Sequence, residues 1–213
     1  MVLPVQQPSQ EFLALQQRNT PQVVAIAIQQ VEQVIRDWHL RNQGRRRCSH
    51  MARLQRDYDS GYPETQAPFM WWIGDIYAAS FGEKREQRLM PYKTYTQKGI
   101  IWTGGSDYFV TPFPARYGLW SSIARQTPSG KQPFGTAESV DIRTALKSYT
   151  IWAAHQLFLE DRIGSLEPGK DADIAVWDRD PYSVPTDAIK EMHCELTLLR
   201  GKVVFDSSAA KSR

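Results

Sequence analysis

The N-terminal third of the chain alternates between an ordered hydrophobic pattern and an irregular polar one. Residues 23–28 are a continuous apolar run, and the apolar positions between Val31 and Trp38 then follow helical spacing. We therefore expect a strand followed by a helix over residues 22–39. Residues 41–66 are rich in Arg, Asp, Tyr and Gly without a sustained period, so the pattern predicts no regular element there.

The middle of the chain follows the order of a βα unit. A charged helix is expected from residue 83 onward, with an interruption at Pro91. Residues 99–103 form an apolar run that predicts a buried strand, and Gly104-Gly105-Ser106-Asp107 then ends it with a sharp turn. The spacing predicts a helix over residues 113–127, so strand, turn and helix succeed one another.

Residues 139–158 carry the clearest helical pattern of the sequence. Apolar residues recur there at positions i, i+3 and i+4, which predicts one long amphipathic helix. Ser139 is a suitable N-cap residue, and Asp141 suits the positive end of the helix dipole.

Strand and turn signals fill the C-terminal part of the chain. Glu167-Pro168-Gly169 fits a type II turn, in which Gly169 takes the positive φ angle. Residues 171–178 alternate like a strand, and residues 195–206 predict a hairpin that turns at Arg200-Gly201. The last residues, 207–213, are expected to form a frayed tail.

Composition places the chain among ordinary globular proteins. Its 213 residues are 41% hydrophobic and 23% charged, with a formal net charge of +3. No apolar run reaches the roughly 18 residues that cross a bilayer, and the N-terminus lacks the pattern of a signal peptide, so we expect a cytoplasmic protein without membrane contact. The basic cluster Arg45-Arg46-Arg47 is interpreted as a solvated loop, and no nucleic acid partner is expected.

Cysteine and histidine side chains give no metal pattern by their spacing. Cys48 and Cys194 lie far apart and do not suggest a disulfide scaffold. His39 ends the first expected helix and suits its negative pole, and His155 and His193 are interpreted as structural. From the residues alone, Asp107 is either a turn residue or an acid placed at the end of a buried strand.

The stretch YTIWAAHQLFLEDRIGSLEPGKDADIAVWDRDPY, residues 149–182, resembles the C-terminal region of metal-dependent amidohydrolases of amidohydrolase family 3, the YtcJ-like group. The matching features are a helix, the turn Gly164 to Lys170, a strand opened by Ala172-Asp173-Ile174, and a closing hairpin. The resemblance extends over about residues 68–206, in which residues 68–75 resemble the strand-seven region.

This resemblance implies an α/β fold that is the C-terminal part of a (β/α)8 barrel, together with strands of a small β-sandwich. We expect an incomplete barrel, because a whole barrel takes about 250 residues. The implied organisation is a divergent barrel segment over residues 1–67, βα units over 68–160, β-sandwich strands with their hairpin over 161–206, and the tail over 207–213.

The resemblance also implies a site. The strand-eight motif Gly-Ser-Asp of the family carries a metal-site aspartate, which matches Asp107 and makes it the expected catalytic residue and metal ligand. His50 is the only candidate for the strand-six histidine, and the implied cofactor is zinc or another divalent metal. A catalytic zinc takes about three protein ligands, and the sequence contains no His-x-His pair, so the ligand set is incomplete and the alternative that no metal is bound stays open.

Two functions follow as hypotheses. The first is an amidohydrolase that uses metal-activated water to hydrolyse a carbon–nitrogen bond, other than a peptide bond, in a small-molecule amide substrate. The second is a catalytically inactive fragment that associates with a partner chain. Because half a barrel leaves strand edges unpaired, that partner would be a second copy, giving a homo-oligomer, or a missing N-terminal half.

Overall fold

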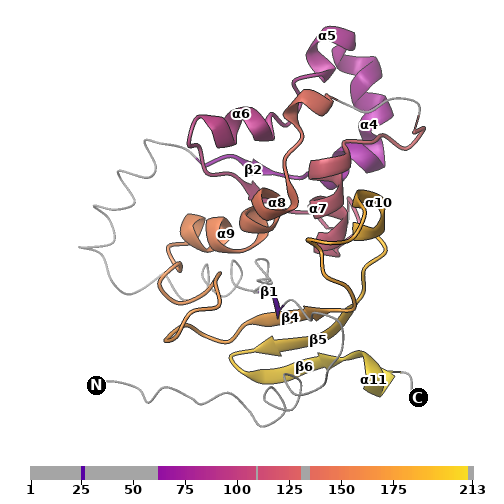
Figure 1. Ribbon diagram of the computed structural model, residues 1–213. Coiled ribbons are helices and arrows are strands. Elements are labelled where there is room, and N and C mark those ends of the chain that lie inside the picture. The colour runs from indigo at the N-terminus through magenta and orange to yellow at the C-terminus, as the bar shows by residue number, and fades with distance from the viewer. Residues whose placement is uncertain (1–24, 27–61, 109, 131–134, 211–213) are drawn as a thin grey trace.

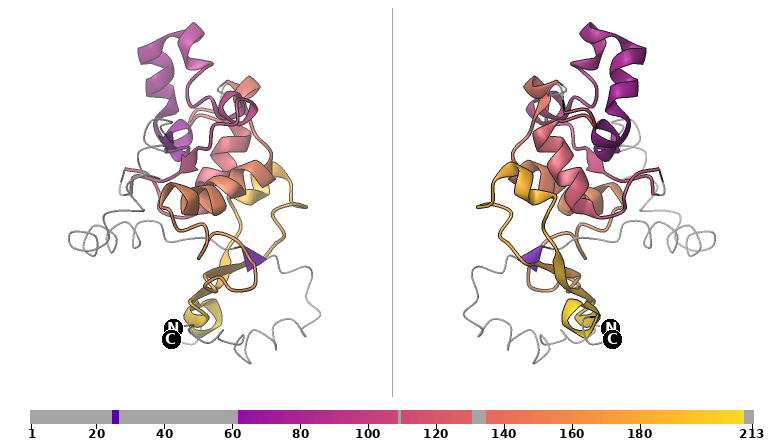
Figure 2. Two further views of the ribbon diagram at one scale, coloured as in Figure 1. Left: turned by 90° about the vertical axis from the view of Figure 1, so that its left-hand side faces the viewer. Right: turned by 90° about the vertical axis from the view of Figure 1, so that its right-hand side faces the viewer.

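The computed structural model describes residues 25–26, 62–108, 110–130 and 135–210. The expected helix after residue 28, His39, the Arg45–Arg47 cluster and His50 lie outside the described residues. In this part of the chain the fold is mixed α/β, with helices gathered above a small antiparallel sheet (Figures 1 and 2). None of the helices within the described ranges is long and apolar enough to span a bilayer.

The upper part is built around a short parallel strand pair. Strand β2 (Glu64–Thr65) pairs with β3 (Thr103–Gly104), so that Glu64 faces Thr103 and Thr65 faces Gly104. The predicted strand after residue 98 is therefore present, but it is paired at its C-terminal end only. Helix α4 (Pro68–Phe81) follows β2 directly and is kinked at Ile73, whose φ of −133° and ψ of 17° are not helical. Residues 68–75, compared above with the strand-seven region, are therefore helical except at that kink.

The helices that follow agree in position with the predicted ones. Pro91 separates α5 (Glu83–Glu86) from α6 (Tyr92–Gln97), because its fixed φ starts a new helix rather than continuing the old one. Helix α7 (Ala115–Ala124) follows β3, and the short η1 (Thr136–Glu138) comes next. The order strand, turn, helix is confirmed.

The long helix predicted over residues 139–158 is wrong in two details. It is divided into α8 (Ile142–Tyr149) and α9 (Ile151–Gln156), because Thr150 lies at φ −129° and ψ −102°, outside the helical region. Its N-cap is Asp141, whose carboxylate accepts a hydrogen bond of 2.7 Å from the Thr144 amide. Ser139 instead donates its hydroxyl hydrogen to the Ile123 carbonyl.

The lower part is a four-stranded sheet in the order β1-β4-β5-β6. Its strands are β1 (Ala25–Ile26), β4 (Ile174–Trp177), β5 (Cys194–Leu199) and β6 (Lys202–Asp206), and all neighbours are antiparallel. β4 is buried along its whole length rather than on alternate residues, because it lies between β1 and β5 and packs against the helices as well.

Two predicted turns are confirmed by their backbone angles. Gly169 has φ 94°, and the Lys170 amide donates to the Glu167 carbonyl at 3.2 Å. Arg200 and Gly201 both have positive φ, 50° and 77°, as the tight turn of a hairpin requires. Two short helices complete the region, α10 (Thr186–Ile189) and α11 (Ser207–Ala210). Asp206 accepts hydrogen bonds from Ser208 at the start of α11, so residues 207–210 are ordered rather than frayed.

One hydrophobic cluster joins the helices to the sheet. It is made of Leu119, Trp120, Ala145, Leu146, Tyr149, Ala175, Trp177, Ile189 and Met192. These residues come from α7, α8, β4 and the α10 region, so the small sheet and the helical layer share a core. A second cluster surrounds Trp102 just before β3 and packs it against Ala67, Met70 and Tyr92.

Candidate functional site

The two faces of the β2–β3 pair have different surroundings. On one face Thr65 and Trp102 are buried beside Tyr92, whose ring stacks on Trp102 with centroids 4.2 Å apart. Because side chains alternate along a strand, Glu64 and Gln66 project to the opposite face. That opposite face opens into a pocket.

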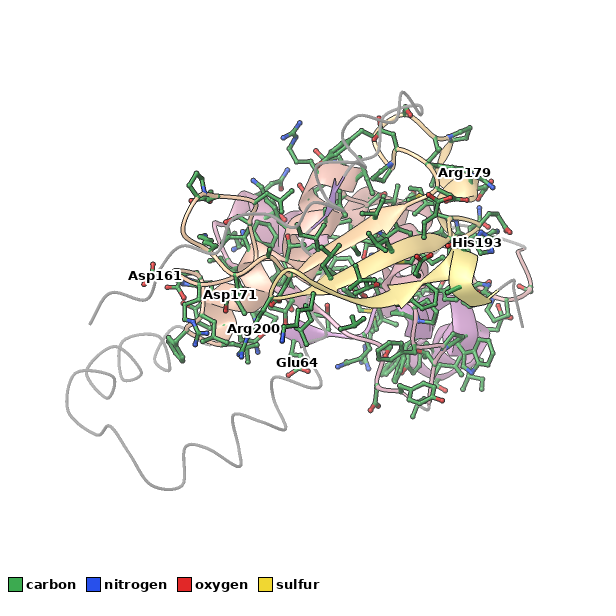
Figure 3. The ribbon with its side chains drawn as sticks, turned by 90° about the horizontal axis from the view of Figure 1, so that it is seen from below. Glu64, Asp161, Asp171, Arg179, His193 and Arg200 are labelled. Atoms are coloured by element: carbon green, nitrogen blue, oxygen red, sulfur yellow. The ribbon has the colours of Figure 1, made fainter. Side chains whose placement is uncertain are left out.

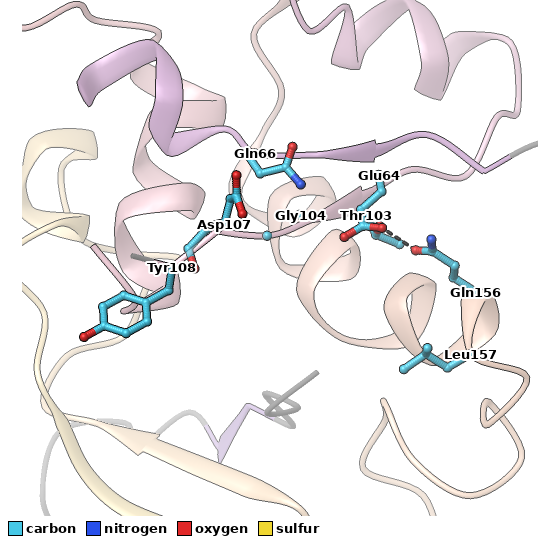
Figure 4. Close-up of a pocket in the computed structure, with 10 residues that line it drawn as sticks. Glu64, Gln66, Thr103, Gly104, Asp107, Tyr108, Gln156 and Leu157 are labelled. Atoms are coloured by element: carbon cyan, nitrogen blue, oxygen red, sulfur yellow. Dashed lines mark hydrogen bonds between the residues drawn. The ribbon is translucent and has the colours of Figure 1, made fainter. Parts of the chain in front are cut away.

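The pocket has a volume of about 210 Å³ and follows the parallel pair towards its carboxyl end (Figure 4). Its lining is Glu64, Gln66, Thr103, Gly104, Gly105, Ser106, Asp107, Tyr108, Gln156 and Leu157. Active sites of α/β folds lie at the carboxyl ends of parallel strands, where loops diverge and leave room for a ligand. The position is therefore that of a candidate active site.

Asp107 lies where the sequence analysis expects an acid, just after β3 and at the pocket. Its φ of 48° is in the left-handed region, which aspartate tolerates better than most residues. Its carbonyl accepts a 2.7 Å hydrogen bond from the Val110 amide, and Thr111 donates to the Ser106 carbonyl. The turn is thus held through its backbone carbonyls, while the Asp107 side chain is exposed at the pocket.

Tyr149 explains why the turn and the following helix contain glycines. A Cβ atom on Gly104 would lie 2.3 Å from the Tyr149 ring, and one on Gly118 would lie 1.7 Å from its hydroxyl oxygen. The ring therefore fills the space between β3 and α7, and its hydroxyl donates to the Gly105 carbonyl at 3.4 Å. Burial raises the pKa of Tyr149, so this hydroxyl stays protonated and remains a donor.

Gln156 is fixed on the other side of the pocket. The buried Thr103 hydroxyl donates to its side-chain oxygen Oε1 at 2.6 Å, which connects α9 to β3. Figure 4 shows the Glu64 carboxylate beside this hydrogen bond and the Asp107 carboxylate towards the other end, near Gln66. The pocket thus has a carboxylate near each end and two carboxamides in its wall.

Glu64, Gln66 and Gln156 were not predicted from the sequence. Glu64 and Gln66 lie in the stretch for which no element is predicted, because a two-residue strand is too short to show a period. The available signal was the two-residue spacing of these polar side chains immediately before an ordered segment. Gln156 was counted as part of an amphipathic helix, and only the tertiary structure brings it to β3.

The two histidines among the described residues, His155 and His193, do not line the pocket. His155, interpreted as structural, connects two segments. Its Nε2 atom is 3.1 Å from the Tyr62 hydroxyl, and its Nδ1 atom is 3.2 Å from a Glu160 oxygen. His193 lies at the end of the small sheet near Arg179, while Arg200 and Asp171 lie at the opposite end (Figure 3). The His193 amide donates to Asp178 at 2.9 Å.

A metal ion is not accommodated by the described residues alone. Within residues 62–108, 110–130 and 135–210, no three His, Cys, Asp or Glu side chains come close enough together to hold one. Asp107 supplies one exposed carboxylate, and a catalytic zinc takes about three protein ligands. His50 lies outside the described residues, so its predicted pairing with Asp107 stays a prediction.

Comparison with curated proteins finds relatives of much greater length. The chain is 26% identical over 142 residues to a protein described as a putative amidohydrolase YtcJ from Bacillus subtilis, covering 66% of this chain. It is 29% identical over 143 residues to the N-substituted formamide deformylase of Arthrobacter pascens, covering 67% of this chain. In both cases the match spans 26% of the relative, so the chain corresponds to about a quarter of their length.

Solved structures and family models agree with these relatives. A metal-dependent hydrolase from Pyrococcus horikoshii matches with a TM-score of 0.50 and 27% identity, over 60% of this chain and 26% of that one. The model of the amidohydrolase family matches residues 22–205, which is most of the chain. The chain therefore belongs to the amidohydrolase family, in the family 3 group that its sequence resembles.

Proposed function

We propose that this chain carries part of the active site of an enzyme that hydrolyses a carbon–nitrogen bond, other than a peptide bond, in a small amide. The observation that carries the proposal is the place of Asp107, which follows a buried strand and lies at a pocket along the strands' carboxyl ends. Membership of the amidohydrolase family supports the reaction class, and the deformylase among the relatives supports an amide as substrate.

Asp107 acts as the general base and then as the general acid in the proposed reaction. As a water oxygen bonds to the amide carbon, the Asp107 carboxylate takes a proton from that water. The proton then passes to the amide nitrogen as the carbon–nitrogen bond breaks, so that one carboxylic acid and one amine leave. The hydrogen-bonded turn around Asp107 keeps its carboxylate at the pocket, so the base is already in position when a substrate binds.

A divalent metal in this protein would need ligands beyond the described residues. Asp107 would be one ligand, and His50 is the candidate that the sequence adds. The need for further ligands also suggests what a partner chain would contribute. If the remaining ligands belong to a second copy or to an N-terminal half, the complete site exists only in that complex.

The test is hydrolysis of an N-substituted formamide by the full chain, followed by release of formate, with and without added zinc. Formate release that falls by about a hundredfold or more in Asp107→Ala would support the proposal. Asp161→Ala, an exposed aspartate outside the pocket, is the matched control and should keep the wild-type rate. Equal rates in Asp107→Ala and wild type, or no formate under either condition, would contradict the activity of this chain.

The second candidate is a non-catalytic chain that associates with a partner. The observation that favours it is the exposure of large apolar side chains on α4, where Trp72 and Ile76, on either side of the kink at Ile73, are 48% and 63% exposed. Sedimentation velocity tests it. A dimer that dissociates in Ile76→Lys would support it, whereas a monomer at all concentrations would contradict self-association.

A further inference from the structure

The end of the pocket distant from Asp107 contains a second pair of polar side chains. Glu64 comes from β2 and Gln156 from the last turn of α9, and both line the pocket (Figure 4). The reaction proposed above uses neither of them. Their arrangement bears on which molecules the pocket can accept.

Gln156 is oriented by its hydrogen bond. A carboxamide has an oxygen that accepts and an NH2 group that donates two hydrogen bonds. The Thr103 hydroxyl, itself only 3% exposed, occupies the oxygen Oε1 at 2.6 Å. This hydrogen bond takes one of the two lone pairs of Oε1 and fixes the orientation of the carboxamide, so that the Nε2 group offers the donors of Gln156 to a ligand in the pocket. Its natural acceptor is the carbonyl oxygen of an amide.

The charge of the lining is one-sided. Glu64 and Asp107 are carboxylates, and none of the other lining residues that the structure describes is Lys, Arg or His. A ligand carboxylate would face two like charges and no countercharge from these described residues, whereas an ammonium group or an amide N–H would find an acceptor. The volume of the pocket, about 210 Å³, lies below the usual range for drug-sized ligands and suits a small amide.

We propose that Glu64 and Gln156 form the substrate-selecting end of this pocket. Gln156 donates its Nε2 hydrogens to the carbonyl oxygen of a small amide, and Glu64 accepts from a neutral or cationic nitrogen substituent. The pocket consequently favours amides with an amino group and disfavours those with a carboxylate. This inference rests on the proposed function, because it names the substrate class of the same pocket.

The experiment measures binding rather than turnover. Three probes of similar size are titrated into the full chain labelled with ¹⁵N: N-aminoethylformamide, N-propylformamide and N-formylglycine, which are cationic, neutral and anionic. Dissociation constants come from the shifts of the side-chain amide signals, of which those missing in Gln156→Met belong to Gln156. Because no reaction is needed, the result stands apart from the presence or absence of hydrolysis.

The expected order of affinity is cationic, neutral, anionic, with about a threefold to fivefold preference for the cation over the neutral probe, as for a partly exposed ion pair. In Glu64→Gln the cationic and neutral probes should bind equally, and Gln156→Met should weaken all three. Glu191→Gln, an exposed glutamate outside the pocket, is the matched control and should keep the wild-type order.

Several results would overturn the inference. They are the absence of binding by all three probes, an anionic probe that binds as tightly as the cationic one, and a preference that survives Glu64→Gln but disappears in Asp107→Asn. Formamide hydrolysis with an unchanged probe order in Glu64→Gln would leave the proposed function intact and reject this inference alone. Charge-dependent binding without hydrolysis would support the selecting role of Glu64 and Gln156 and reject the proposed hydrolytic function alone.

Discussion

The β2–β3 pair has only four paired residues, Glu64, Thr65, Thr103 and Gly104, yet its two faces have different neighbours. One face packs against helices and the other lines the pocket. The helix-facing side is closed, because Trp102 is fully buried and stacks on Tyr92 while Tyr149 leaves no room for a side chain at Gly104. The opposite side is open and polar, and its side chains line a pocket instead of a core. One face therefore determines stability, and the other is available for chemistry.

This difference explains how a strand pair of such short length can hold a site. A two-stranded pair is marginal by itself in water. The apolar face anchors the strands to the helices, so the polar face does not need to contribute to folding. Substitutions on the helix-facing side should then lower the free energy of unfolding, whereas substitutions on the open side should change ligand binding or turnover.

The largest loss of stability is expected for Trp102→Ala. The side chain is fully buried and its Nε1 group donates to the Thr96 hydroxyl at 3.1 Å, so its removal leaves a cavity and breaks one hydrogen bond. We expect the free energy of unfolding to fall by about 3–5 kcal/mol, measured by urea denaturation. Trp72→Ala, which removes a half-exposed tryptophan from α4, should cost under about 1 kcal/mol. Equal costs would contradict the role of the helix-facing side.

A smaller loss is expected for Gly118→Ala. The added methyl group would meet the Tyr149 hydroxyl, and overpacking of this kind costs about 1–3 kcal/mol. Tyr149→Phe removes that hydroxyl and should recover part of the loss in the double variant. A double-mutant cycle by denaturation measures this coupling. Strictly additive costs would show that Tyr149 does not fill the space between β3 and α7.

The pH dependence of the helical layer gives a third prediction. Burial acts to raise the pKa of Glu138, but hydrogen bonds from Thr94 and the charge of Arg125 outweigh it, so the pKa lies below its ordinary range. A carboxyl group with a lowered folded-state pKa stabilises the protein above its unfolded-state pKa of about 4.3, and this contribution is lost as the pH falls through the folded-state value.

Glu138→Gln should therefore cost roughly 1–2 kcal/mol at pH 7, as for a lost hydrogen bond to a charged group. The difference between wild type and variant should shrink as the pH falls below about 4.3 and should disappear below the lowered folded-state pKa of Glu138, where both side chains are neutral. Denaturation at several pH values measures it. A difference that stays constant with pH would show that the Glu138 charge does not contribute to stability.

The smallest effect on stability is expected on the open face. Glu64 is exposed, so Glu64→Gln should change the free energy of unfolding by less than about 0.5 kcal/mol. The same variant should change the order of probe affinities. Glu64→Gln is thus expected to affect binding and not stability, whereas Trp102→Ala is expected to lower stability. A large loss of stability in Glu64→Gln would remove the distinction between the two faces.

The sequence predicted the elements that depend on local chemistry. The interruption at Pro91, the hairpin at Arg200-Gly201 and the turn at Gly169 follow from fixed or positive φ angles, which neighbouring residues decide. The break at Thr150 and the full burial of β4 were not predicted, because both depend on packing against distant segments. Tertiary contacts overrode a helical pattern in one case and an alternating pattern in the other.

The candidate site was predictable only in part, for the same reason. Asp107 was found because a glycine-rich turn after an apolar run is a local signal that also matches the family motif. Gln156 lies 53 residues from Thr103 in the chain, and no pattern along the sequence indicates their hydrogen bond. Glu64 and Gln66 flank a strand too short to be recognised by periodicity.

The most direct test of the separation between the faces is one pair of measurements on Asp107→Asn. The free energy of unfolding by urea and the rate of formate release from an N-substituted formamide are determined on the same preparation. We predict a rate at least about a hundredfold lower, with stability within about 0.5 kcal/mol of wild type. An unchanged rate, or a loss of stability that accompanies the loss of rate, would contradict the account.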